Sequence, residues 1–228
     1  MGRAKEIIVK VIPSKIGNAF IKNHHYSGKV VNNSVLHFGA FLDGTLHGVL
    51  SYGSPLDKRK VLPLVQPCLW NEMLELNRMA FDEYLPKYSE SRCIAISIKL
   101  LKRNAPHIKW LISYADGCQC GDGTIYRASG FVLTSVKVNS TLGTLNGKVV
   151  ADFTFEKGIH ILKNNGKAAA PKEFKMMAGF QLRYIYLIDK TCKITVPILP
   201  FSKIDEIGAG MYKGKRITLQ ERKQAIEA

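Results

Sequence analysis

Side chains able to carry out a reaction gather at a few places in the sequence. His25 and Tyr26 place an imidazole and a phenol side by side. Asp116 ends an almost wholly apolar segment, and Tyr126 follows ten residues later. A carboxylate at the end of a buried segment loses hydration, which suits it to act as a general base toward an amine or hydroxyl. Tyr126 could then donate a proton to a leaving group.

Each of these residues also has a structural explanation. Histidine complements the dipole at a helix C-terminus, a carboxylate can brace a turn, and buried tyrosines commonly hydrogen-bond. Arg78 is either paired with the nearby Glu75 or directed into a site. The phosphate loop GxxxxGK[ST], the zinc motif HExxH and the nucleophile motif GxSxG do not occur. Nucleotide hydrolysis, zincin chemistry and hydrolase-elbow catalysis are therefore poorly supported.

The chain carries a large excess of positive charge, +15, from 33 Lys and Arg against 18 Asp and Glu. Nucleic-acid phosphate is the commonest partner of such a surplus, although charge alone never names a ligand. Five cysteines and no secretory signal indicate reduced thiols, and the pair Cys118 and Cys120 is spaced too closely for a usual zinc half-site. No apolar run is long enough for a membrane span, so we expect a cytoplasmic protein without membrane contact.

The apolar patterns predict an α/β fold of the α+β type, a mixed sheet with helices on both faces. Predicted strands cover 6–12, a hairpin at 37–53 that turns at Asp43-Gly44, 69–81, 107–116, 131–138 and a closing pair at 183–189 and 193–199. Predicted helices cover 13–23, a longer segment that Ser89 caps and Pro106 ends, and 123–130. Residues 1–200 are expected to form one domain with a basic insertion at 139–179, followed by a charged tail at 201–228.

Several motifs, taken in order, resemble the Mom family of bacteriophage DNA adenine-modification proteins, a divergent branch of the GNAT (Gcn5-related N-acetyltransferase) fold. The motifs are NHHYS at 23–27, ELNRM at 75–79, SES at 89–91, SYAD at 113–116 and GTIYRA at 123–128. Together they span about residues 20–135 and leave the insertion and the tail uncovered. The resemblance implies a GNAT-like, mostly antiparallel central sheet with helices on both faces.

The resemblance also implies an activity. Mom-like proteins convert adenine in phage DNA to N6-carbamoylmethyladenine, which shields the genome from restriction nucleases. By similarity, Asp116 would orient or deprotonate the adenine amine and Tyr126 would protonate the leaving group. His25 and Tyr26 would hold a base flipped out of double-stranded DNA or help proton transfer. Donor or phosphate binding is expected at the helix start and the preceding strand, from Arg78, Ser89 and Ser91.

The donor is left open. Acetyl-CoA is a candidate, but residues 87–92 contain no glycine where GNAT enzymes carry a Q/R-x-x-G-x-G/A loop. An iron-assisted step would fit His25, Tyr26 and Asp116, although the sequence names no metal site. Two alternatives stay open: an acetyl-CoA-dependent N-acyltransferase acting on a protein or small amine, and a non-catalytic basic DNA-binding module. The DNA context and the oligomeric state are not predicted.

Overall fold

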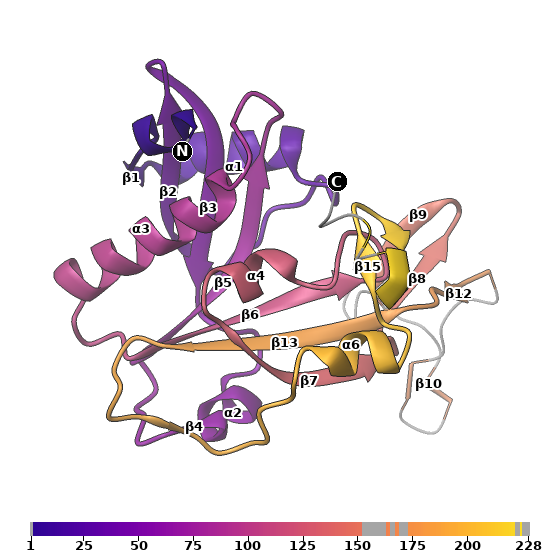
Figure 1. The fold of residues 1–228 in the computed structure, drawn as a ribbon. Helices are drawn as coiled ribbons and strands as arrows, with labels where there is room; N and C mark the ends of the chain where they lie inside the picture. Colours follow the sequence, from indigo (N-terminus) through magenta and orange to yellow (C-terminus); the bar gives the residue numbers. More distant parts are fainter. Residues whose placement is uncertain (1, 152–162, 165–166, 169–172, 222–223, 225–228) are drawn as a thin grey trace. The chain divides into compact units, whose positions relative to one another are not determined.

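The structure is a computed structural model that describes residues 2–151, 163–164, 167–168, 173–221 and 224. The chain divides into two compact units (Figure 1). The first unit contains Met1–Ala115, Gly123–Ser135 and Arg183–Phe201, and the second contains Asp116–Asp122, Val136–Leu182 and Ser202–Ala228. The predicted insertion at 139–179 falls in the second unit, and part of it lies outside the described residues.

A seven-stranded sheet with the order β1-β2-β3-β5-β6-β13-β7 forms the centre of the fold. Its strands are β1 (Ile8–Ile12), β2 (Ser34–Leu42), β3 (Thr45–Gly53), β5 (Met73–Phe81), β6 (Trp110–Gly117), β7 (Val132–Val138) and β13 (Phe180–Leu187). The pairs β1–β2, β2–β3 and β3–β5 are antiparallel, and β5 runs parallel to β6. The predicted mixed, mostly antiparallel sheet is confirmed.

The hairpin between β2 and β3 turns where the sequence predicts it. Asp43 and Gly44 both have positive φ, 51° and 79°, which the tight two-residue turn of an antiparallel hairpin requires. Glycine reaches that conformation without strain and aspartate tolerates it, so this dipeptide fixes the register locally. The two strands then align Phe38 with Leu50 in the core of the sheet.

Two helices cover opposite faces of the sheet in the first unit. His37 and Ser51 share one face, joined by a 2.7 Å contact between Nδ1 and Oγ, and the imidazole packs beside Gly17 of α1 (Ser14–His24). Tyr52 follows Ser51 and its hydroxyl lies 2.7 Å from Ser97 Oγ of α3 (Ser89–Asn104). Because successive strand residues point to opposite faces, these are an α1 face and an α3 face. The predicted helices on both faces are confirmed.

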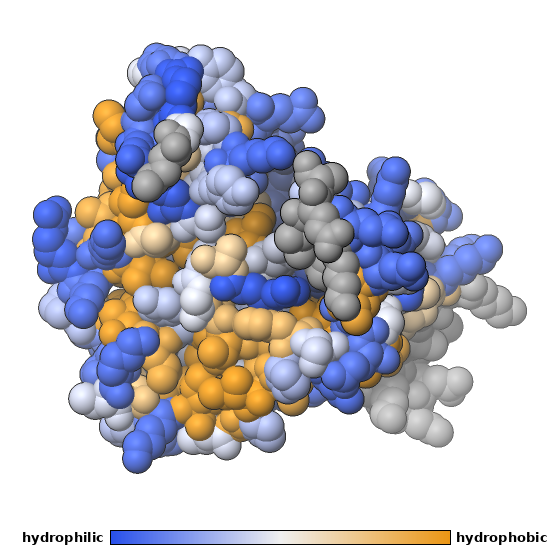
Figure 2. All heavy atoms as spheres, viewed as in Figure 1, coloured by the Kyte–Doolittle hydropathy of each residue, from blue (hydrophilic) through white to orange (hydrophobic). Residues whose placement is uncertain are grey.

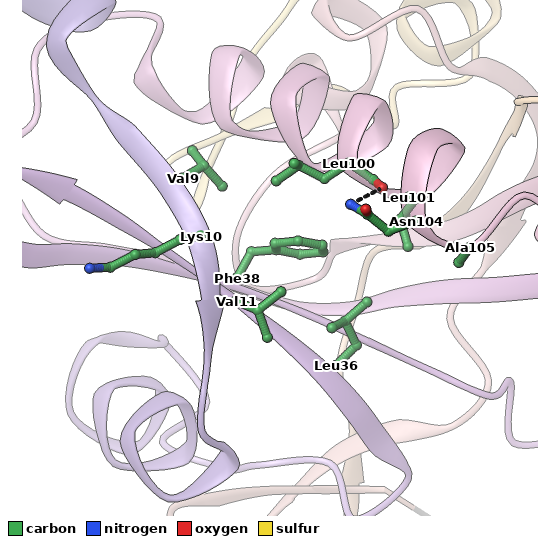
Figure 3. Close-up of a pocket in the computed structure, with 9 residues that line it drawn as sticks. All are labelled: Val9, Lys10, Val11, Leu36, Phe38, Leu100, Leu101, Asn104 and Ala105. Atoms are coloured by element: carbon green, nitrogen blue, oxygen red, sulfur yellow. Dashed lines mark hydrogen bonds between the residues drawn. The ribbon is translucent and has the colours of Figure 1, made fainter.

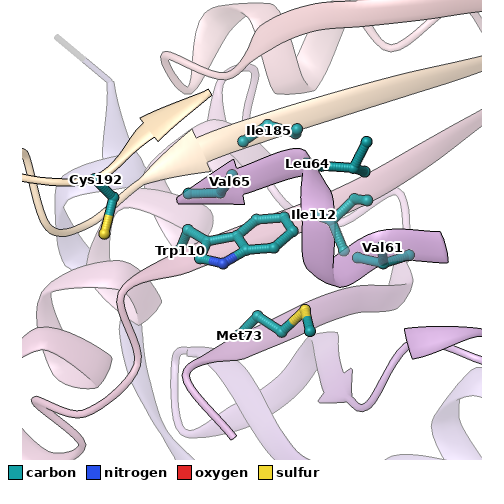
Figure 4. Packing of buried hydrophobic residues seen from close by; sticks show 8 residues of the cluster. All are labelled: Val61, Leu64, Val65, Met73, Trp110, Ile112, Ile185 and Cys192. Carbon is teal, nitrogen blue, oxygen red and sulfur yellow. The ribbon is translucent and has the colours of Figure 1, made fainter. Parts of the chain in front are cut away.

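A hydrophobic cluster lies between the sheet and the segment that follows β3 (Figure 4). Trp110, fully buried on β6, is its largest member, and its indole N–H donates to Cys68 Sγ at 2.9 Å. The covering segment forms α2 (Lys58–Val61), the 3₁₀ turn η2 (Leu62–Leu64) and β4 (Val65–Gln66). The proline-rich stretch 55–67 therefore contributes apolar side chains to the core.

The predicted closing strand pair is wrong in its second member. β14 (Lys193–Ile194) pairs with β4, so the chain leaves β13 and returns to the segment before β5. Pro197 and Pro200 follow and lack the N–H that a continued ladder would need. Leu199 makes only an isolated antiparallel bridge with Leu133.

The second unit contains a hairpin of β8 (Leu142–Leu145) and β9 (Lys148–Ala151), with β12 (Lys175–Met176) beside β8. The region predicted as a charged tail also carries structure, α6 (Ser202–Glu206) and a hairpin of β15 (Met211–Tyr212) and β16 (Lys215–Arg216). The remaining short elements are η1 (Arg3–Glu6), α4 (Thr124–Ala128), β10 (Lys163–Asn164) and β11 (Lys167–Ala168). None of the described helices has the length and apolar character needed to cross a membrane.

Candidate active site

The central strands β5 and β6 form three ladder pairs and then separate. Glu75 opposite Ile112 is the last of these pairs, although β5 continues to Phe81 and β6 to Gly117. One side-chain bond still spans the two strands, from Ser113 Oγ to the carbonyl of Leu76 at 2.8 Å. Parallel strands that separate in mid-sheet open a place where a ligand can reach the interior.

At this opening, a β-bulge changes the direction in which the side chains of β5 point. Arg78 pairs with Ser51 and Leu76 with Tyr52, so Asn77 is an extra residue on β5. Asn77 is buried, its Oδ1 accepts from Ser34 Oγ at 2.9 Å, and its Nδ2 has no partner among the described residues. Bulges of this kind are frequent next to active sites because they redirect side chains.

His25 and Tyr26 lie on the α1 face, directly after α1 ends at His24. The Nδ1 of His25 accepts from the Ser27 amide at 3.1 Å and lies 2.8 Å from Ser27 Oγ. An accepting Nδ1 leaves the ring proton on Nε2. Burial, and then the charge of Arg78, lower the pKa of His25 to about 4. The imidazole is therefore neutral at physiological pH and presents a donor rather than a base.

The ring of Tyr26 lies 4.2 Å from that of His25, centroid to centroid, and its side chain is half exposed. An exposed aromatic face beside a neutral imidazole can stack on a planar heterocycle. The structure thus places together two of the residues predicted to hold a base.

Arg78 fastens the segment after α1 to β5. Its Nε donates to the carbonyl of Lys29 at 3.0 Å, and its Nη1 donates to the carbonyl of Asn77 at 2.7 Å. The guanidinium therefore positions the loop that carries His25 and brings positive charge to it. No ion pair between Arg78 and Glu75 is formed in the described part of the chain, so the structural pairing considered for them is not what holds Arg78.

Three further residues of this face were given no role on the basis of the sequence. Glu75 is opposite Gly53 on β3, and Tyr114 lies two residues beyond Ile112 on β6. Burial, and then the charge of Glu75, raise the pKa of Tyr114 to about 12. Arg183 of β13 donates to Thr134 Oγ1 at 3.0 Å, and its pKa is lowered by burial. Glu75 carried a sequence signal, since an acid in an otherwise apolar strand needs a reason.

Tyr126 lies on the α3 face. Its ring is 5.3 Å from that of the buried Tyr184 and 5.6 Å from that of Phe131. It is also near enough to Tyr52 to contribute to the raised pKa of that phenol, which burial chiefly causes. Since Tyr52 hydrogen-bonds α3, Tyr126 is on the opposite side of the sheet from His25 and Arg78.

The start of α3 differs from the prediction. Tyr88, in a left-handed conformation with φ of 71°, is the N-cap, so Ser89 is the first helical residue and not the cap. Ser89 is buried and its hydroxyl donates to the carbonyl of Pro86, which holds the turn that enters the helix. Ser91 donates to the Tyr88 carbonyl at 3.2 Å. Helix α3 packs against α4, which carries Tyr126.

Asp116 belongs to the second unit, where its carboxylate braces a turn. It accepts from the Cys118 amide at 2.9 Å, from Gln119 Nε2 at 2.7 Å and from Gln181 Nε2 at 3.4 Å. Burial, and then the charge of Asp116, raise the pKa of Cys118 to about 11.

The described residues do not fit the iron centre considered for His25, Tyr26 and Asp116. In that part of the chain, no three His, Cys, Asp or Glu side chains gather closely enough to hold a metal ion. The Nδ1 of His25 is already occupied by Ser27. No step of the reaction proposed below therefore involves iron.

A separate cavity of about 350 Å³ lies between β1, β2 and the C-terminal half of α3 (Figure 3). Apolar side chains form most of its lining, among them Val9, Leu36, Phe38 and Leu100. Asn104 donates to the carbonyl of Leu100 at 3.0 Å, so its amide is engaged within its own helix. A polar purine would find few partners there, and the cavity is not a good site for one.

Basic residues are distributed over the helices of the first unit. Hydrophilic side chains cover much of the face shown in Figure 2, including the C-terminal half of α3. Exposed lysines and arginines there and on the other helices include Lys15, Lys22, Arg59, Lys60, Lys99, Lys102 and Arg103. Part of the excess positive charge therefore lies on the folded helices of the first unit.

One protein family matches most of the chain. The Mom protein family matches residues 6–203. The methylcarbamoylase mom of Escherichia phage Mu is 31% identical over 198 residues, which is 83% of this chain and 79% of that protein. Similar solved structures include a GNAT family acetyltransferase from Elizabethkingia anophelis with acetyl-CoA bound (13% identity, TM-score 0.47, 80% of this chain and 98% of that chain). Another is the spermidine/spermine N-acetyltransferase SpeG from Vibrio cholerae (10% identity, TM-score 0.49, 83% and 97%).

Proposed function

The chain belongs to the Mom protein family, and from this premise we propose that it is a transferase that modifies DNA. The relative in phage Mu is a methylcarbamoylase, and the corresponding reaction here converts adenine in double-stranded DNA to N6-carbamoylmethyladenine. The modified DNA is phage DNA in the host cytoplasm, and the adduct shields it from restriction nucleases.

One observation carries the proposal: two groups of reactive side chains lie on opposite faces of the sheet in which β5 and β6 separate. His25, Tyr26 and Arg78 lie on the α1 face, and Tyr126 and the start of α3 lie on the other. A transferase must admit an acceptor and a donor to one place from different directions. We assign the α1 face to the acceptor and the α3 face to the donor.

The acceptor side suits a base extruded from the duplex. Extrusion costs a few kcal/mol, and stacking on an aromatic ring can offset part of this cost. Tyr26 offers such a ring, and the neutral His25 offers its Nε2 proton to a ring nitrogen of the base. Arg78 holds the segment that follows them at the Lys29 carbonyl, and burial, together with the charge of Arg78, keeps the imidazole uncharged.

The chemical step requires a proton to leave the exocyclic amine of adenine, whose lone pair is delocalised into the ring. We assign the acceptance of that proton to Asp116 and the donation of a proton to the leaving group to Tyr126. His25 cannot serve as this base in the tautomer observed, because its Nδ1 already accepts from Ser27.

The donor's class is not fixed by these residues. Acetyl-CoA binding remains a candidate, although an acetyl group lacks the nitrogen of the carbamoylmethyl product and cannot supply that group by itself. The first helical bond of α3 runs from the Arg92 amide to the Tyr88 carbonyl at 3.2 Å. The amides of Glu90 and Ser91 precede it and lack intrahelical partners by geometry, as at the start of any helix. They are positioned to bind an anionic group of the donor, whereas the hydroxyls of Ser89 and Ser91 donate to backbone carbonyls.

Protection against restriction tests the proposal. DNA from cells that express the chain should resist nucleases whose recognition sites contain adenine, and DNA from cells that express Asp116→Ala should be cut. Cutting in both samples, with both proteins soluble, would contradict the proposal. Tight acetyl-CoA binding without DNA dependence would then indicate an N-acyltransferase for a protein or small amine. Salt-sensitive DNA binding that Asp116→Asn leaves unchanged would indicate a binding module.

A further inference from the structure

Glu75 is a mostly buried acid for which the proposed reaction has no use. It lies at the last ladder pair before β5 and β6 separate. Burial raises the pKa of its carboxyl group to about 7, and the charge of Arg78 acts in the opposite direction. In the described part of the chain its carboxyl group accepts no hydrogen bond. The side chain is of intermediate exposure, so a ligand can reach this carboxyl group and supply a partner.

The surroundings of Glu75 suit a flat, polar ligand. Arg78 faces it from its own strand, Tyr114 faces it from β6, and His25 is next to Arg78 after α1. Tyr26 is 51% exposed and Tyr114 is 41% exposed, so aromatic surface is available on the same face of the sheet. The carboxyl group thus belongs to the acceptor side of the opening.

We propose that Glu75 binds the Watson–Crick edge of the adenine to be modified. Its hydroxyl donates to N1, and its carbonyl oxygen accepts from the N6 amine. This inference rests on the proposed function and adds to it the residue that holds this edge of the base. One N6 hydrogen is engaged, while the second hydrogen and the open face of the amine remain for the transferred group.

Hydrogen-bond complementarity supports this contact. Adenine presents an acceptor, N1, beside a donor, N6, and a protonated carboxyl group presents a donor beside an acceptor. Because either carboxyl oxygen can carry the proton, the same group can also pair with the ring N–H and carbonyl oxygen of guanine or thymine. The contact therefore holds the edge of the base and does not by itself select adenine. An ionised carboxylate would instead face the lone pair of N1.

Binding to two nearly identical DNA probes tests the contact with N1. The probes are fluorescein-labelled duplexes that carry one adenine, or one 1-deazaadenine, opposite an abasic site, which lowers the cost of extrusion. Anisotropy at pH 6 and fixed salt should show the unaltered chain preferring adenine by about 10-fold, the worth of one buried hydrogen bond. Glu75→Gln should keep the preference, because its amide donates at the same place. Glu75→Met should abolish it.

The pH dependence separates a neutral acid from a carboxylate. The preference of the unaltered chain for adenine should shrink as the pH rises from 6 to 8.5, while that of Glu75→Gln stays constant. The groups facing Glu75 are Arg78, which remains charged, and Tyr114, whose raised pKa keeps it neutral in this range. A preference that grows with pH, or one that Glu75→Met retains, would overturn the inference.

The result also distinguishes this inference from the proposed function. The unaltered chain, Glu75→Gln and Glu75→Met could all prefer the adenine duplex over the 1-deazaadenine duplex to the same degree. If the unaltered chain nevertheless modifies adenine in cells, that result contradicts only the role of Glu75. A chain that neither binds either duplex nor modifies adenine contradicts the proposed function as well. Glu75→Gln has the shape of glutamate without its charge, so its behaviour does not depend on whether Glu75→Met folds well.

Discussion

The low pKa of His25 predicts that acid destabilises the folded chain through this residue. The pKa is about 4 in the folded chain against 6.5 for an unperturbed histidine, because burial and Arg78 disfavour the charged form. Below pH 6.5 the unfolded chain therefore binds a proton that the folded chain does not bind. Stability from this group is present above pH 6.5 and is lost as the pH falls toward 4.

The magnitude follows from the difference between the two pKa values. A pH of 5 lies about 1.5 pH units below the pKa of an unfolded histidine. Protonation of His25 therefore favours the unfolded state there by about 2 kcal/mol, at about 1.36 kcal/mol per unit. Glu75 acts in the opposite sense. Its pKa of about 7 in the folded chain exceeds the usual 4.5, so its contribution is complete below pH 4.5 and is lost as the pH rises through 7. The stability of the unaltered chain can therefore change little between pH 7.5 and 5.

A comparison with His25→Asn isolates the contribution of the imidazole. The amide oxygen of asparagine can accept from the Ser27 amide as Nδ1 does, and it does not titrate in this range. Urea unfolding measures the free energy of unfolding of both proteins at pH 7.5 and pH 5. On acidification, that of the unaltered chain should fall by about 2 kcal/mol relative to that of His25→Asn. The same change in both proteins would refute the assignment of the low pKa to His25.

Three other substitutions have definite expected outcomes. Glu75→Gln should remove the stability gained on acidification from pH 7.5 to 5, about 2 kcal/mol by urea unfolding; an unchanged pH dependence would argue against a raised pKa. Trp110→Ala empties the centre of the cluster in Figure 4 and should cost about 3–5 kcal/mol in chemical denaturation; a loss below about 1 kcal/mol would contradict that packing. Gly53→Ala places a Cβ 2.0 Å from the Asn33 carbonyl oxygen, so it should displace the segment after α1 and reduce adenine modification; an undiminished yield would show that the segment's position is unimportant.

Local signals predicted the elements of the fold well. The Asp43-Gly44 turn requires positive φ at two residues, and the sequence supplies the types that tolerate it. The period change after β5 predicted α3, with an error of one residue at its cap because Tyr88 adopts the left-handed conformation usually left to glycine or asparagine. Pairing between distant segments was not predictable in this way, as the partnership of β14 with β4 shows.

The candidate site was predicted in its residue types but not in its arrangement. His25, Tyr26 and Arg78 come together because the bulge at Asn77 turns Arg78 toward the Lys29 carbonyl. Tyr126, expected to act together with Asp116, lies on the α3 face of the first unit, and Asp116 belongs to the second unit. Glu75 could not be recognised as an unpartnered acid from sequence, because its burial depends on where two parallel strands stop pairing.

Mass spectrometry of nucleosides tests the central claim most directly. Total DNA from cells that express the chain, digested to nucleosides, should contain deoxyadenosine with the mass of a carbamoylmethyl adduct. The adduct should be absent when Asp116→Ala is expressed at the same soluble level. Deoxyadenosine of unmodified mass in both samples would contradict the assignment of this chain to adenine modification, and an adduct that persists in the variant would contradict the role of Asp116.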